Sequence, residues 1–268
     1  MNIAEFLKSE NIFEYATLPI EKIRVVNPRR YERISERFTP KTVLLFLMPY
    51  YAFESSSNIS RYAVPRDYHF FAEELKNRAK TVFDCEFELC ADTSPINEVE
   101  ACVEAGLGVV GRNSLLINRR YGSWVFLGEF YFPFEENDPF FNGVEKREVA
   151  EKTCIGCGEC ERVCKSIRDG DRSSCISFIN QKKKIDESEE KLIFESTYVW
   201  GCDECQRVCP MNTGEETPIE FFFKNRISRL DKETLKDLIE TGEFSRRAYS
   251  WRGEGVISRN VEIFEKNK

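Results

Sequence analysis

Eight closely spaced cysteines constrain this chain more than any other feature of its sequence. The stretch TCIGCGECERVCKS carries four of them, separated by two, two and three residues, and WGCDECQRVCP carries three more. Cys175 lies between the two groups, and Cys85, Cys90 and Cys102 lie upstream. Thiols this close together are typical of disulfides, of structural zinc or of iron–sulfur clusters, and each requires the segment to fold around a few centres.

The disulfide interpretation conflicts with the expected compartment. The N-terminal stretch MNIAEFLKSEN contains Glu5 and Glu10 where a secretory signal is apolar, so we expect a cytoplasmic protein with reduced thiols. The longest apolar run, from Thr42 to Met48, is too short to cross a bilayer, so we expect no membrane partner. Zinc also uses Cys-x2-Cys pairs and stays an alternative, although its sites rarely need runs this long.

The spacing favours iron–sulfur clusters. Cys-x2-Cys-x2-Cys-x3-Cys is the run that holds a [4Fe–4S] cluster in bacterial ferredoxins, where the fourth cysteine serves a second cluster. Gly156 and Gly158 suit the tight turns because glycine tolerates positive φ. Exchanging the outer cysteines completes two ligand sets: Cys154, Cys157, Cys160 and Cys209 for the first cluster, and Cys164, Cys175, Cys202 and Cys205 for the second. The three upstream cysteines are expected to be buried core thiols.

Hydrophobic periodicity in the rest of the chain predicts an α+β protein. Residues 42–48 and 122–132 are typical of buried strands, and CEFELC of a half-exposed strand with Glu86 and Glu88 on its polar face. Ser94 before Pro95 is typical of a helix start. We expect an N-terminal α/β domain over residues 1–150, a ferredoxin-like double-cluster domain over 151–215, and a short helical segment over 216–268. Within this last segment, Asp231 is expected to cap a helix.

The order of several motifs resembles that of the epoxyqueuosine reductase family. These motifs extend over roughly residues 37–265: ISRYAVPRDYH, DTSPINEVEACVEAGLGVVGRNSLLI, YGSWVFLGEF, CISF, WGCDECQRVCPMN and SWRGEGVISRN. The resemblance implies an oxidoreductase whose N-terminal domain binds a base-off cobalamin and whose two [4Fe–4S] clusters receive electrons from an external low-potential donor. It also implies a reaction, the reduction of epoxyqueuosine in the tRNA anticodon loop to queuosine.

The resemblance also assigns roles to individual residues. Asp92, in ADTSP, matches the family's proton donor and is expected to face the cobalamin. A carboxylic acid donates a proton near neutral pH only where burial raises its pKa. Lys182 matches a position that approaches the tRNA, and His69 is expected to belong to the framework rather than to bind cobalt. The remaining cobalamin contacts are expected from Tyr62, Arg112, Asn113, Leu116, Ser123, Leu127 and Ser177.

Simpler interpretations of the same residues stay open. Asp92 is also typical of a turn, Leu116 and Leu127 of a core, and Lys182 of a solvated run of lysines. Longer family members carry helical repeats after the SWRG segment, whereas this sequence ends at Lys268, and its net charge of −7 disfavours an indiscriminate grip on nucleic acid. A small-molecule substrate therefore remains an alternative to tRNA, and a non-catalytic two-cluster electron carrier remains the alternative to an enzyme.

Overall fold

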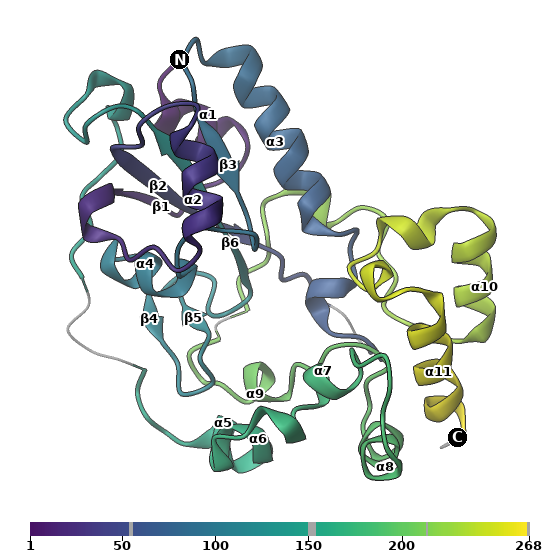
Figure 1. Cartoon of the computed structure of the whole chain (residues 1–268). Helices are drawn as coiled ribbons and strands as arrows, with labels where there is room; N and C mark the ends of the chain where they lie inside the picture. The colour runs from purple at the N-terminus through teal and green to yellow at the C-terminus, as the bar shows by residue number, and fades with distance from the viewer. Residues whose placement is uncertain (54–55, 150–153, 213, 267–268) are drawn as a thin grey trace. The chain divides into compact units, whose positions relative to one another are not determined.

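The computed structural model describes residues 1–53, 56–149, 154–212 and 214–266 (Figure 1). Its contacts divide the chain into two compact units, which we call unit 1 and unit 2. Unit 1 comprises Met1–Tyr50, His69–Gly156 and Thr213–Ile219, and unit 2 comprises Tyr51–Tyr68, Cys157–Asn212 and Glu220–Lys268. The expected domain boundary between residues 150 and 151 lies outside the described residues.

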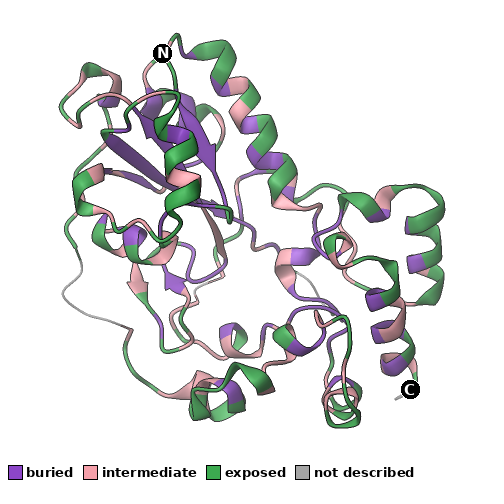
Figure 2. Ribbon diagram, viewed as in Figure 1, coloured by how far each residue is buried: buried purple, intermediate pink, exposed green. Residues whose placement is uncertain are grey.

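Unit 1 is built on a four-stranded sheet. Every strand pairing in this sheet is antiparallel, which strand–helix alternation in the sequence could not specify. The predicted strand at residues 42–48 is confirmed and is buried along its whole length, as Figure 2 shows for the sheet. The strands follow one another in the order β1 (Tyr15–Pro19), β2 (Thr42–Pro49), β6 (Val125–Phe132) and β3 (Glu88–Cys90).

Helices pack on both faces of this sheet, so unit 1 has three layers. On one face, Ile34 of α2 (Pro28–Ser35) and Cys102 of α4 (Glu98–Glu104) join a core with alternate residues of β2. On the other face, the rings of Phe6 in α1 (Ile3–Ser9) and Phe132 in β6 both contact Phe83, which follows α3 (Tyr68–Val82). A short ribbon of β4 (Val109–Val110) and β5 (Leu116–Ile117) completes the described strands.

Ser94 and Pro95 predicted a helix whose first residue is Pro95. The helix instead begins three residues later, at Glu98. Asn97 caps α4 by accepting the N–H of Glu100 at 3.2 Å. The segment before it is extended instead, because the Pro95 carbonyl accepts the N–H groups of Val26 and Asn27. Long-range pairing with residues 25–27 therefore overrides the local preference of Ser-Pro for a helix start.

Unit 2 consists of short helices around a core that contains Trp200, Tyr249 and Ile257. Its last two helices follow the sequence prediction, with Asp231 capping α10 through the N–H of Thr234 at 2.9 Å. Its α-helices are α5 (Glu159–Val163), α6 (Lys165–Asp169), α7 (Ile176–Ile179), α8 (Glu187–Glu195), α9 (Glu204–Arg207), α10 (Lys232–Glu240) and α11 (Glu254–Glu265).

Single 3-10 turns connect these elements in both units. They are η1 (Ile20–Lys22), η2 (Arg61–Ala63), η3 (Pro139–Phe141), η4 (Arg172–Ser174), η5 (Glu220–Phe222), η6 (Glu243–Arg246) and η7 (Ser250–Arg252). The mixture of an antiparallel sheet and many helices confirms the α+β class. Within the part of the chain that the structure describes, no helix combines the length and the apolar character that a bilayer crossing requires.

Candidate functional site

Asp92 lies at the centre of a tight turn that follows β3. Its φ is +63°, and the N–H of Thr93 donates to the carbonyl of Ala91 at 2.7 Å across it. A three-residue turn closed in this way at positive φ is a rare, strained γ-turn, which aspartate tolerates better than most residues. Strained backbone of this kind is concentrated at functional sites, so the geometry favours more than a simple turn role for Asp92.

The side chain of Asp92 is open to solvent. It is 69% exposed, and His69 Nε2, at the start of α3, lies 4.0 Å from its Oδ2. The protein's own atoms do not bury this carboxyl, so the burial expected for a proton donor would have to come from the cofactor and the substrate. The turn places the carboxyl at the surface beside the chain's one histidine.

The end of the sheet that carries Asp92 also carries two of the expected cofactor contacts. Because β3 runs antiparallel to β6 with Cys90 opposite Glu129, the residues after Cys90 run toward the Leu127 end of β6. Leu127 is half-buried, and Ser123, just before β6, is buried at 4% exposed. Thus Asp92, Leu127 and Ser123 share one end of the sheet.

The GRNSLLI segment presents its expected contacts unevenly. Arg112 is exposed, with its Nη2 atom 3.7 Å from where a Cβ on Gly156 would lie, so it stands beside the first cysteine loop. Asn113 is half-buried and uses its Oδ1 to accept the N–H of Leu115 at 3.4 Å. Leu116 is 3% exposed and belongs to the core of unit 1, as its simpler interpretation had it.

Two neighbouring glutamates behind Asp92, Glu129 buried and Glu98 half-buried, were not identified by sequence reasoning. Glu129 in β6 is 0% exposed, and burial raises its pKa well above the usual range, with the nearby Glu98 carboxyl adding to the rise. Burial also raises the pKa of Glu98 in α4 to about 6. The Glu98 Oε1 accepts the backbone N–H of Asp92 at 3.1 Å. The sequence signal for this pair was Glu129 in the motif SWVFLGEF, because an acidic residue inside an otherwise apolar strand is unusual.

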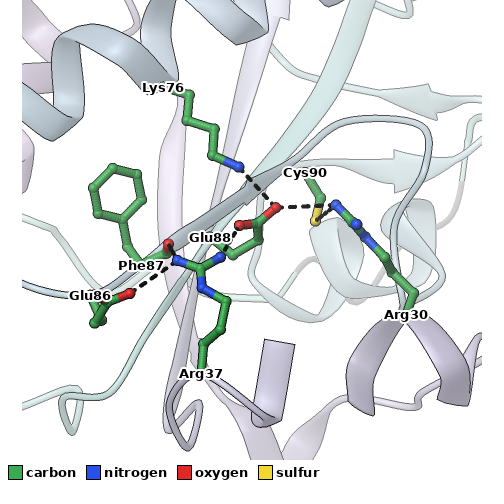
Figure 3. A network of polar contacts seen from close by, with 7 residues as sticks. All are labelled: Arg30, Arg37, Lys76, Glu86, Phe87, Glu88 and Cys90. Carbon is green, nitrogen blue, oxygen red and sulfur yellow. Dashed lines mark hydrogen bonds and ion pairs between the residues drawn. The ribbon is translucent and has the colours of Figure 1, made fainter. Parts of the chain in front are cut away.

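A second buried acid, Glu88, corrects the expectation that CEFELC is a half-exposed strand. Glu88 is 6% exposed, and Figure 3 shows it between three cations, from α2, from the segment just after α2 and from α3. Lys76 Nζ lies 2.9 Å away, Arg37 Nη1 2.6 Å and Arg30 Nη2 3.1 Å. Burial opposes ionisation, but Lys76, Arg37 and Arg30 outweigh it and lower the pKa of Glu88. We find no reactive partner for this network and regard it as a link between α2, α3 and β3.

The first cysteine run has the backbone that its glycines predict. Gly156 has φ +69° and Gly158 has φ +78°, both in the left-handed region that a side chain disfavours. Gly158 precedes α5, which begins at Glu159 and carries Cys160. Cys157 is exposed and acts electrostatically on Cys160, so these two thiols face a common region.

Three of the four cysteines assigned to the second cluster are neighbours in unit 2. Burial raises the pKa of the Cys202 thiol, and Asp203, Cys205 and Cys175 add to the rise because they lie close to it. No three His, Cys, Asp or Glu side chains of the described residues converge closely enough to hold a single metal ion.

Buried amides hold the second cysteine run in place. Asn180 Nδ2 donates to the carbonyl of Gly201 at 2.9 Å, and Asn180 Oδ1 accepts the Gly201 N–H at 3.2 Å. Asn260 Nδ2 donates to the carbonyls of Asn180 at 2.7 Å and Val199 at 3.0 Å. Both asparagines are 0% exposed. These bonds connect the segments CISFIN, VWGC and SRN, which lie far apart in the sequence.

The other expected contacts lie in unit 2. Tyr62 is half-buried in η2, and burial raises its pKa. Ser177 is half-buried in α7, where its carbonyl accepts Gln181 Nε2 at 2.7 Å. The ammonium of Lys182 pairs with Glu189 and lies 5.0 Å from the ring centre of Phe178. Cys90 and Cys102 are buried core thiols as expected, whereas Cys85 is half-exposed.

Comparison with known proteins identifies the family of this chain. The 4Fe-4S dicluster domain family matches residues 153–213. Epoxyqueuosine reductases of Listeria monocytogenes and Lactococcus garvieae are each 31% identical, over 74% and 76% of this chain. That of Cyclobacterium marinum is 30% identical over 85% of this chain and 77% of its own length. The chain belongs to the epoxyqueuosine reductase family.

Solved epoxyqueuosine reductases share the fold as well. The enzyme of Streptococcus thermophilus superposes with a TM-score of 0.71 at 23% identity, and an epoxyqueuosine reductase crystallised with an epoxyqueuosine-modified tRNA stem loop with 0.74 at 20%. Each match covers 98% of this chain and 80% of the other. Residues 153–213 therefore form an iron–sulfur domain, as the cysteine spacing predicted, within an epoxyqueuosine reductase fold. The chain spans only 54% and 60% of the length of the Listeria and Lactococcus relatives.

Proposed function

We propose that this chain is an iron–sulfur and cobalamin-dependent oxidoreductase that reduces epoxyqueuosine to queuosine. The observation that carries the proposal is the 31% identity to epoxyqueuosine reductases over about three quarters of the chain. A non-catalytic electron carrier would need only the iron–sulfur domain, which leaves most of unit 1 without a role. We expect the reaction to take place in the cytoplasm.

We assign two [4Fe–4S] clusters to the eight clustered cysteines. The first would be held by Cys154, Cys157, Cys160 and Cys209, and the second by Cys164, Cys175, Cys202 and Cys205. The mutual electrostatic influence of Cys175, Cys202 and Cys205 supports the second set. The positive φ of Gly156 and Gly158 supports a loop wrapped around the first. Electrons would enter through these clusters from an external low-potential donor.

Cobalamin is the second proposed cofactor. Ser123 and Leu127, at the Asp92 end of the sheet, would contact the corrin together with Arg112, Asn113 and Leu116 from the adjoining segment. The family resemblance also assigns Tyr62 and Ser177 to the corrin. When bound, the cobalamin supplies a low-valent metal centre that reduces the epoxide carbon, and the protein supplies orientation and protons.

Asp92 would protonate the epoxide oxygen as it leaves the carbon. The open position of its carboxyl allows a substrate to approach, and binding of the substrate and the corrin would supply the burial that a carboxylic acid needs for this task. In a solved relative from Bacillus subtilis, the loop of a catalytic aspartate is swung out of the active site. The Asp92 turn is likewise at the surface, where its carboxyl can be approached by a substrate.

The substrate that we propose is the modified nucleoside in a tRNA anticodon loop, with a small-molecule electrophile as the alternative. A relative crystallised with a modified tRNA stem loop supports the first. Lys182 is the proposed tRNA contact, and it would have to exchange its Glu189 partner for a phosphate. The net charge of −7 implies a local contact rather than a broad basic surface.

Reconstitution with defined cofactors tests the proposal. Protein reconstituted anaerobically with iron, sulfide and cobalamin, then desalted, should retain about eight irons and one cobalt per chain. It should convert epoxyqueuosine tRNA to queuosine tRNA with a chemical reductant. Asp92→Asn should keep both cofactors and lose conversion, whereas Asp84→Asn, an exposed aspartate beyond α3, should behave as the parent. Retained iron without retained cobalt would overturn the reductase assignment.

A further inference from the structure

Glu129 has surroundings that no ordinary core residue tolerates. It lies in the centre of the sheet, between Leu45 of β2 and Cys90 of β3, and is 0% exposed. Neither of its carboxyl oxygens has a hydrogen-bond partner of ordinary geometry among the described residues. An unpartnered buried carboxyl is costly to keep, so its presence calls for a role.

The groups that face Glu129 leave it no cation as a partner. The α4 helix contributes Glu98 and Cys102, β3 contributes Cys90, and β6 itself contributes Tyr131, with Ser94 before α4. The Arg30 guanidinium donates to Cys90 Sγ and to Glu88 instead. A carboxyl buried without a cation is neutral, and a neutral carboxyl has a proton to donate.

Glu98 connects this buried acid to the Asp92 turn. The Glu98 carboxyl helps to raise the pKa of Glu129, and its Oε1 accepts the Asp92 N–H at 3.1 Å. The charged and titratable groups around Glu98 are Glu129, Asp92 and His69. Glu98 is also the first residue of α4, whose position on the sheet is set by the core contacts of Ala101, Cys102 and Ala105. The acceptor of the Asp92 N–H is thus anchored to the rigid part of unit 1.

We propose that Glu98, supported by the neutral carboxyl of Glu129, is a positioning residue that holds the Asp92 turn in its strained conformation. The inference rests on the proposed role of Asp92 as the proton donor. A turn at positive φ opens unless its surroundings hold it, and a carboxylate is a stronger acceptor for a backbone N–H than a neutral group. Glu129 supports Glu98 as a neutral neighbour, because a second negative charge there would repel the Glu98 carboxylate, and Glu129 does not contact the substrate.

Amide hydrogen exchange of residues 91–96 in the reconstituted protein tests the anchor. Glu98→Ala should speed exchange of the Asp92 amide about tenfold or more, because the bond to a charged acceptor is lost. Glu98→Gln keeps a hydrogen-bond acceptor without the charge. It should therefore speed exchange of the Asp92 amide several-fold less than Glu98→Ala does. Glu100→Ala is the matched control: this acid lies on the same helix, pairs with Arg24 at the surface, and should leave the exchange unchanged. If Glu98→Ala does not fold, Glu98→Gln decides, and an unchanged exchange rate in either folded variant overturns the proposal.

Infrared spectroscopy tests the protonation of Glu129 independently. The parent protein at pH 7.5 should show the carbonyl band of a protonated carboxylic acid, which Glu129→Gln should remove and Glu98→Gln should retain. Absence of the band in the parent would overturn the proposal.

Neither readout requires turnover, so a failure of the inference is distinguishable from a failure of the proposed function. Should the parent prove active, Glu98→Ala should lower kcat for epoxyqueuosine tRNA at an unchanged KM. Exchange that responds to Glu98→Ala in a protein with no reductase activity would support the positioning role and reject the function. An active parent whose Asp92 amide exchanges at the same rate in Glu98→Ala would support the function and reject the positioning role.

Discussion

The carboxylate of Asp203 accepts the backbone N–H of Arg61 at 2.7 Å, and this bond joins two segments that lie 142 residues apart in the chain. The hydroxyl of Ser60 donates to the same carboxylate. Asp203 is 2% exposed and lies between Cys202 and Cys205, so it ties the second cysteine run to the η2 segment of unit 2. The same segments meet again where the Ser60 N–H donates to the Trp200 carbonyl at 2.8 Å.

Removing the Asp203 carboxylate should destabilise the chain. Asp203→Ala leaves two buried donors unpaired and is expected to lower the free energy of unfolding by about 2–3 kcal/mol, with a further loss of retained iron. Asp203→Asn keeps one acceptor and should cost less. Denaturant unfolding measures both, with Asp237→Ala on the exposed face of α10 as the control. Equal stability of the Asp203 and Asp237 variants would contradict the role assigned to this carboxylate.

Replacing Glu88 should destabilise unit 1 in a pH-dependent way. Glu88→Ala leaves three cations without their shared partner, and because these are themselves 26–46% exposed we expect a loss of about 2 kcal/mol, below that of a fully buried pair. The pKa of Glu88 is lowered, so its contribution is present above the unfolded pKa and disappears as the pH falls through the folded pKa. The difference between parent and variant should therefore shrink in acid. Glu86→Ala, which removes an exposed partner of Arg37, should cost far less at every pH.

The opposite pH dependence is expected for Glu98. Its pKa is raised to about 6 by burial, so the folded protein holds this proton more tightly than the unfolded chain does. The stabilisation is complete below the unfolded pKa and is lost as the pH rises from about 4.5 to about 6. Relative to Glu98→Gln, the parent should lose roughly 2 kcal/mol of unfolding free energy over this interval. Thermal unfolding at closely spaced pH values measures the difference, and a constant difference would exclude a raised pKa.

Single cysteine substitutions should separate the two ligand sets. Cys175→Ser is expected to reduce the iron retained after anaerobic reconstitution from about eight atoms to about four, because only the second cluster depends on it. Cys85→Ser, outside both sets, should retain the full amount. Electron paramagnetic resonance of the reduced protein should show the magnetic coupling of two clusters in the parent and none in Cys175→Ser. Full iron retention by Cys175→Ser would require a different fourth ligand.

Short-range patterns predicted much of this protein correctly. The buried strand β2 and the Asp231 cap of α10 both follow from residues close in sequence. The iron–sulfur domain follows from the same kind of signal, because ligands for one cluster must be spaced to wrap it. Even the positive φ at Gly156 and Gly158 is a local property of glycine.

The tertiary structure decided which polar groups are buried and what they touch. Glu88 has the spacing of an exposed strand residue, yet it is covered because α2 and α3 bring three cations onto it. Glu129 and Glu98 are 31 positions apart, and only the packing of α4 on β6 makes them a pair. Hydrophobic periodicity records which side of an element faces a core, whereas burial of a charge depends on partners from distant segments. For that reason the sequence alone indicated the iron–sulfur domain and several of the main elements, and only the fold placed Asp92 in a strained turn whose N–H donates to Glu98.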